Sequence, residues 1–149
     1  MLQDTIKMTG DLKIVLTDEN GQIKHEQEVK NLVVTVGKNF IASSMIKTTT
    51  NSPAAMTHMA IGSGTTAAAN GDTTLGTELG RVALTSNVVT TNNVAYVATF
   101  PAGTGTGAIT EAGIFNASSA GTLLCRTVFS VINKGAADTL GITWTVTVN

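Results

Sequence analysis

The stretch Leu140–Val148 (LGITWTVTV) alternates apolar and small side chains for nine residues near the end of the chain. Ile142, Trp144, Val146 and Val148 fall on one face, and the threonines between them fall on the other. Successive side chains of a β-strand point to opposite faces, so this pattern predicts a strand with one buried face. The same period of two recurs upstream, which indicates an all-β chain.

The other expected strands are short and regularly spaced. Between the first two, Asn20-Gly21 predicts a tight hairpin with both residues at positive φ. About eight to ten strands at this spacing, without a βαβ rhythm, predict an antiparallel β-sandwich of jelly-roll-like type, with the strand order left open. The ranges are Leu12–Thr17, Gln22–Val29, Leu32–Val34, Met56–Gly62, Leu79–Val88, Val94–Phe100, Ile109–Asn116 and Thr122–Ile132.

One segment, residues 37–46, breaks the period of two. Its apolar residues recur at helical spacing, which predicts a helix of about two turns that must pack against a sheet to be stable. We therefore expect residues 1–38 to form a charged arm with a β-hairpin and residues 39–149 to form the sandwich. The two parts are expected to make one compact domain.

Charged residues are scarce, at 13% of the chain against about 25% in typical domains. Residues 1–38 hold eleven of the nineteen, and only seven follow Lys47. A surface so poor in charge is weakly protected against association. Either the domain is a threonine-rich monomer, or much of its surface is covered by sister subunits or a larger assembly, and we favour the second interpretation.

Composition also excludes several classes of protein. The net charge of -1 argues against a nucleic-acid partner, and no apolar run is long enough for a membrane helix. The first residues do not resemble a signal peptide, and the single cysteine, Cys125, cannot form an internal disulfide. We expect a protein made in a reducing cytoplasm that uses neither a membrane nor nucleic acid as a partner.

Motifs for catalysis, metals or cofactors are missing from the sequence. His25 and His58 lie far apart and are expected to be a solvated residue and a satisfied sheet residue, and Cys125 is expected to be a buried, inert thiol. The glycine-rich segments 62–64 and 103–107 lack the lysine of a phosphate-binding loop and are expected to be turns. We therefore expect no enzyme activity, no cofactor and no metal.

The few charges that fall within apolar strand patterns are more informative. A charge on an apolar face is costly unless it is paired. Glu111 is expected to share a face with Ile109 and Phe115, and Arg126 is flanked by Leu124 and Val128. We expect one structural ion-pair network within or between subunits, with a catalytic acid as the weaker alternative. Its candidate residues are Glu78, Arg81, Glu111 and Arg126.

Three runs around these residues resemble a family of small structural proteins of tailed-bacteriophage virions. They are Met59–Thr66 (MAIGSGTT), Leu75–Leu84 (LGTELGRVAL) and Ile109–Phe115 (ITEAGIF). The same order of motifs occurs more loosely near the start of phage tail-collar and tail-fibre proteins. The resemblance implies a non-enzymatic, β-rich, oligomeric virion component.

Within that family the chain length favours a head decoration (cement) protein on the capsid surface, because it leaves no room for a fibre shaft and tip. The implied partners are the major capsid protein and sister copies, with a homotrimer as the expected assembly. A small tail fibre, adaptor or baseplate component is the alternative, and a host-glycan-binding module is a weaker one. The expected capsid contacts lie in the N-terminal segment, at Leu2, Thr5, Ile6, Met8 and Leu12.

Overall fold

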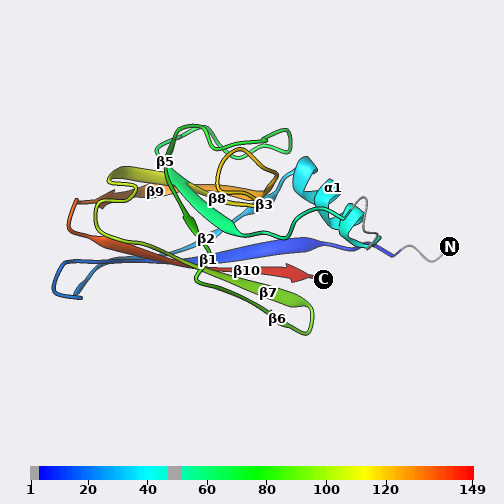
Figure 1. Ribbon diagram of the computed structural model, residues 1–149, viewed down its shortest axis with the longest axis horizontal. Helices are drawn as coiled ribbons and strands as arrows, with labels where there is room; N and C mark the ends of the chain where they lie inside the picture. Colours follow the sequence, from blue (N-terminus) through cyan, green and yellow to red (C-terminus); the bar gives the residue numbers. More distant parts are fainter. Residues whose placement is uncertain (1–3, 47–51) are drawn as a thin grey trace.

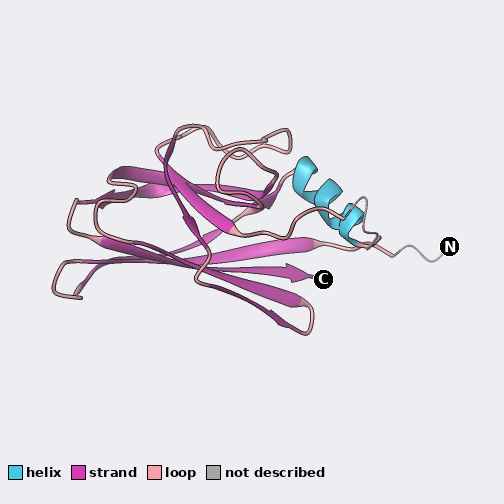
Figure 2. Ribbon diagram, in the orientation of Figure 1, coloured by secondary structure: helices cyan, strands magenta, loops and turns pink. Residues whose placement is uncertain are grey.

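The computed structural model describes residues 4–46 and 52–149, which form two antiparallel sheets and one helix (Figures 1 and 2). The first sheet has the order β2-β1-β10-β7-β6, and the second has the order β3-β9-β8-β4-β5. The all-β sandwich predicted from the sequence is therefore confirmed. The elements are β1 (Met8–Thr17), β2 (Ile23–Lys30), β3 (Leu32–Val33), α1 (Thr35–Ser44), β4 (His58–Gly62), β5 (Glu78–Ala83), β6 (Ser86–Thr90), β7 (Asn93–Phe100), β8 (Gly107–Phe115), β9 (Leu123–Lys134) and β10 (Thr139–Val148).

The core lies between the sheets and takes residues from both. In the first sheet, β1 pairs with β10 so that Leu12 lies opposite Trp144 and Ile14 opposite Ile142. These four side chains are at most 1% exposed, and they share one apolar cluster with residues of the second sheet. The alternation that predicted the last strand thus places Ile142, Trp144 and Val146 in the core, while Val148 at the end of the strand is 41% exposed.

The N-terminal hairpin is part of this sandwich and not a separate arm. β1 lies between β2 and β10, and its inward side chains belong to the core. The expected boundary at residue 38 therefore falls inside one continuous packing unit, within α1. The hairpin turn also differs from the expected form, because Gly21 has a φ of 78° while Asn20 does not adopt a positive φ. Asp18 shapes the turn instead, since its Oδ1 accepts hydrogen bonds from the N–H groups of Asn20 and Gln22.

Two other elements differ from the expected ranges. The helix covers residues 35–44 and not 37–46, and it packs against β9 at one end of the sandwich (Figure 1). The single strand expected over Leu79–Val88 is two strands, β5 and β6, which belong to different sheets. The chain crosses from one sheet to the other at Leu84 and Thr85. The alternation of side chains does not reveal this crossing, because it depends only on neighbouring residues and not on which strand they pair with.

Candidate functional site

The outer face of the second sheet carries small residues where a long loop covers it. Along one row of the sheet, Arg126 of β9, Gly113 of β8, Ala60 of β4 and Arg81 of β5 are successive cross-strand partners. Residues 63–77, the loop between β4 and β5, lie over this row (Figure 1). The side chain of Leu75 reaches to within 2.9 Å of the position that a Cβ on Gly113 would take. The small residues therefore give the 63–77 loop room to pack directly on the sheet.

Glu111 lies on this outer face because β8 has an irregular register. The pairing of β8 with β9 shifts between Ile109 and Glu111. Ile109 consequently belongs to the core between the sheets, whereas Phe115 belongs to a small second cluster with Leu75 and Leu123 on the outer side. The expectation that Glu111 shares a face with Ile109 is wrong. The irregularity between these two residues interrupts the alternation of faces, so their side chains point to opposite sides of the sheet.

The Glu111 carboxylate binds the 63–77 loop through its backbone. Its Oε1 accepts hydrogen bonds from the N–H groups of Gly64 at 2.8 Å and Thr77 at 2.7 Å. Its Oε2 accepts one from the N–H of Gly76 at 2.8 Å. The side chain is fully buried, so these bonds form away from water. One carboxylate therefore ties both ends of the loop to the middle of the sheet.

Arg126 completes the site and joins a third part of the loop to it. Its Nε and Nη2 donate to Glu111 Oε2 at 3.0 and 2.8 Å, and Nη1 donates to Asp72 Oδ2 at 2.7 Å. Nη2 also donates to the carbonyl oxygen of Thr66. Asp72 was not among the residues predicted for this site. Its presence among the seven charges after Lys47 was the only sequence signal for it.

The pKa values of both carboxyl groups are set by these contacts. Burial works to raise the pKa of Glu111, but the N–H groups of Thr77, Gly76 and Gly64 together with Arg126 outweigh it and leave the pKa below its ordinary value. Burial likewise opposes ionisation of Asp72, and the N–H of Ala69 together with Arg126 lowers its pKa. Both groups are therefore held as carboxylates at neutral pH.

The other predicted pair, Arg81 and Glu78, is separate from this site. Arg81 donates from Nε and Nη2 to the two carboxylate oxygens of Glu78 at 2.9 and 2.7 Å. Its guanidinium carbon lies 3.7 Å from the centroid of the Phe115 ring, and Nη1 donates to the carbonyl oxygens of Ala117 and Ala120. The single network predicted from the sequence is thus two clusters, both within one chain, with Arg81 absent from the Glu111 cluster.

The Glu111 site has the chemistry of an anchor. Both carboxylate oxygens and all three guanidinium nitrogens of Arg126 already have partners inside the chain. In the part of the chain that the structure describes, no group of three or more His, Cys, Asp and Glu residues is arranged to hold a metal ion. Cys125 is buried as expected, and burial raises the pKa of its thiol well above the ordinary value. The glycine segment 62–64 does bind an anion, but that anion is the side chain of Glu111.

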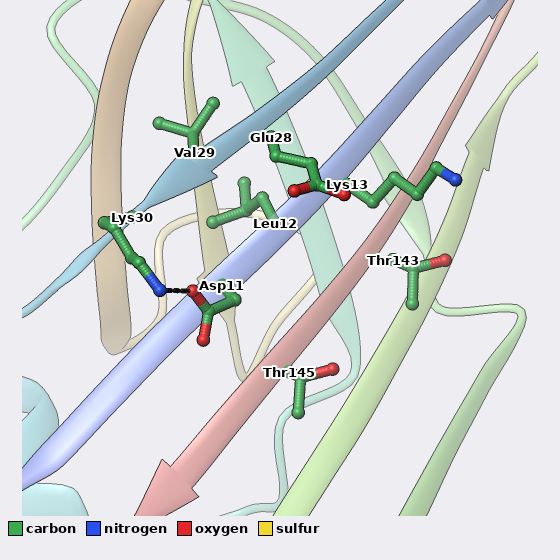
Figure 3. Close-up of a pocket in the computed structure, with 8 residues that line it drawn as sticks. All are labelled: Asp11, Leu12, Lys13, Glu28, Val29, Lys30, Thr143 and Thr145. Atoms are coloured by element: carbon green, nitrogen blue, oxygen red, sulfur yellow. Dashed lines mark hydrogen bonds and ion pairs between the residues drawn. The ribbon is translucent and has the colours of Figure 1, made fainter.

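A shallow depression on the outer face of the first sheet is a second candidate site (Figure 3). Asp11 and Lys13 of β1 lie beside Glu28 and Lys30 of β2, and Thr143 and Thr145 of β10 form the other side (Figure 3). Lys30 forms an ion pair with Asp11, and Lys13 lies 3.4 Å from Glu26 of the same hairpin. The two cations and two anions that line the depression balance each other, so it has no net preference for a charged ligand.

The expected capsid-contact residues lie in different environments. Thr5 and Ile6 are exposed, Ile6 at 76%, while Met8 is partly buried and packs against the core. Leu12 is 1% exposed, so the expectation that it contacts a partner is wrong: the β1–β10 ladder turns it into the core. Leu2 lies outside the described residues.

Comparison of the chain with family models, with curated proteins and with solved structures finds no match. Within residues 4–46 and 52–149, no helix has the length and apolar character needed to cross a membrane.

Proposed function

We propose that this chain is a structural protein of a bacteriophage virion, and specifically a head decoration protein that binds and stabilises the major capsid protein lattice. The motif resemblance supports the virion assignment, and the observation that carries the capsid contact is the exposed N-terminal segment beside an apolar groove. Ile6 and Met8 line the groove together with Leu32 and Val33 of β3 and Ile41 of α1, and Lys7 and Lys38 add positive charge. An apolar groove with two lysines suits a protein segment that carries apolar and acidic side chains.

The backbone hydrogen bonds at the end of the β1–β10 pairing determine which N-terminal residues remain free to contact the capsid protein. The N–H of Lys7 donates to the carbonyl oxygen of Asn149, and the N–H of Asn149 donates back to that of Lys7. Lys7 is therefore already paired, whereas Asp4, Thr5 and Ile6 precede the ladder and are exposed. Strand addition by this segment to an edge of the capsid protein would use main-chain hydrogen bonds and little side-chain specificity.

The rest of the molecule suits a passive role in an assembly. Glu111, Arg126 and Asp72 hold a surface loop rigidly to the sheet, and their polar groups are engaged within the chain. Sugar-binding sites usually stack the sugar on exposed aromatic rings. All six aromatic residues lie in the described part of the chain and each is buried or half-buried, which argues against the glycan-binding alternative. They are Phe40, Tyr96, Phe100, Phe115, Phe129 and Trp144.

Copy number in purified virions tests the proposal first, by quantitative mass spectrometry against the major capsid protein. A count in the hundreds, in a simple ratio to the capsid protein, supports decoration. A count between a few and a few dozen would place the chain on the tail and favour the fibre, adaptor or baseplate alternative. Absence from the virion would remove both.

A truncation tests the contact itself. Removing residues 1–6 is expected to abolish binding to capsids that lack this protein, while the thermal unfolding midpoint stays unchanged because β1 begins at Met8. Ile6→Ala should weaken binding, and Val131→Ala is a matched control at another exposed side chain, 50% exposed on β9. Undiminished binding of the truncated chain would contradict the proposed contact.

A further inference from the structure

Strand β6 forms one edge of the first sheet and leaves its outer side open. Among residues 4–46 and 52–149, Ser86–Thr90 pair only with β7, on one side, and all five residues are exposed. Val88 is 56% exposed and Val89 is 71% exposed, on opposite faces of the strand. An open edge with apolar side chains is a template for pairing with another chain, because its outer N–H and C=O groups lack strand partners.

The apolar face of the core continues onto this edge. Val146 of β10, Val94 of β7 and Val89 of β6 are successive cross-strand partners, so they share one face of the sheet. Val146 is buried, Val94 is half-buried and Val89 is exposed. The row thus starts in the core and ends at an exposed valine on the open edge.

The charge pattern indicates which kind of chain fits. Residues 82–110, which include β6 and β7, contain no Asp, Glu, Lys or Arg. The opposite edge of the same sheet, β2, carries Lys24, Glu26, Glu28 and Lys30. Antiparallel pairing of β2 with its own copy about Gln27 would oppose Lys24 to Lys30 and Glu26 to Glu28, and opposed like charges destabilise a sheet. The β6 edge has no such barrier to its own copy.

We propose that β6 pairs antiparallel with β6 of a second copy of this chain, about a two-fold axis at Val88. In this register Val88 lies opposite the second copy's Val88, Ser86 lies opposite its Thr90, and Asn87 lies opposite its Val89. Pairs of β-branched and hydroxyl side chains are favourable across strands. The contact is isologous and joins the two five-stranded sheets into one continuous sheet.

This inference does not rest on the proposed virion role. A two-fold contact joins copies in pairs, whereas the homotrimer expected from the family resemblance needs a contact between two different surfaces. The two assemblies therefore differ in mass and in their dependence on Val88. A solution measurement of mass distinguishes them.

The test is the molar mass of the purified full-length chain by light scattering or sedimentation across a concentration series. The wild type is expected to reach the mass of a dimer, and Val88→Lys is expected to stay a monomer because it opposes two ammonium groups at the axis. Val131→Lys, the same change at a half-exposed valine of β9, is expected to leave the dimer intact. Circular dichroism spectra and melting midpoints confirm that both variants fold.

A mixing experiment tests the register. Val88→Glu alone is expected to be a monomer, and an equimolar mixture with Val88→Lys is expected to recover the dimer as a mixed species, because residue 88 faces residue 88. A wild-type chain that stays a monomer at the highest concentration would overturn the inference. So would a trimer insensitive to Val88→Lys, dissociation by Val131→Lys to the same degree, or failure of the mixture to associate.

Discussion

At the scale of single residues, Glu111 links the 63–77 loop to the second sheet. It joins three backbone N–H groups and Arg126 in a site without water access. Removing one partner of a buried ion pair leaves an uncompensated charge and costs about 3–5 kcal/mol. We expect Glu111→Gln to lower the free energy of unfolding by about that amount, measured by urea titration with Trp144 fluorescence.

The matched control is Glu78→Gln. Glu78 pairs with Arg81, whose side chain is only 8% exposed, but the Glu78 side chain is 34% exposed. Arg81 also keeps the carbonyl oxygens of Ala117 and Ala120 as partners when the Glu78 charge is removed, so the loss should be smaller than for Glu111. We expect the control to lose less than about 1 kcal/mol. Equal losses in the two variants would show that Glu111 is not the anchor of the 63–77 loop.

The same residues predict how stability depends on pH. The pKa values of Glu111 and Asp72 are lower in the folded chain than their ordinary values, which are about 4.3 for Glu and 3.9 for Asp. The unfolded chain therefore binds protons first as the pH falls, so stability is fully present above about pH 5 and declines as the pH falls toward the folded pKa values. Unfolding free energies between pH 7 and pH 3 should show this decline. The slope should be shallower in Glu111→Gln, and an unchanged slope would contradict the assignment.

At the scale of elements, the 63–77 loop can bind the Glu111 carboxylate only because Gly64 has no side chain at the point of contact. A Cβ on Gly64 would overlap Oε1 of Glu111, whereas a Cβ on Gly71, in the same loop, meets nothing within 4 Å. We expect Gly64→Ala to cost about 1–3 kcal/mol through displacement of the carboxylate. Gly71→Ala should stay within about 0.5 kcal/mol of the wild type.

Hydrogen exchange measures the same contrast locally. The N–H groups of Gly64, Gly76 and Thr77 bind Glu111, so they should exchange slowly in the wild type and in Gly71→Ala. Their protection should fall in Gly64→Ala. Protection that is the same in all three proteins would mean that the carboxylate does not hold the loop.

At the scale of the whole molecule, one core joins the two sheets. Leu12, Ile14 and Trp144 of the first sheet share an apolar cluster with Met59 and Ile114 of the second. A single core of this size favours all-or-none unfolding. We expect urea transitions followed by Trp144 fluorescence and by far-ultraviolet circular dichroism to coincide. Two separated transitions would indicate that the N-terminal hairpin unfolds independently, as a separate arm would.

Local sequence patterns predicted the strands far better than they predicted the residues of the Glu111 site. A period of two is a property of neighbouring residues, so Leu140–Val148 could be recognised as a strand without knowledge of its partner. The pairing of Arg126 with Glu111 was expected from the cost of an unpaired charge on an apolar strand. Its contact with Asp72, 54 residues away, depends on the path of the 63–77 loop, which no local pattern describes.

By itself, the sequence determined that this chain is all-β, poor in charge and free of recognisable catalytic motifs, because composition and alternation are local quantities. Only the tertiary structure decided which sheet each strand joins, as the separation of β5 from β6 shows. It also decided which face Glu111 occupies and that Leu12 is a core residue. These outcomes depend on register, and a shift of one residue moves a side chain from one face of a sheet to the other.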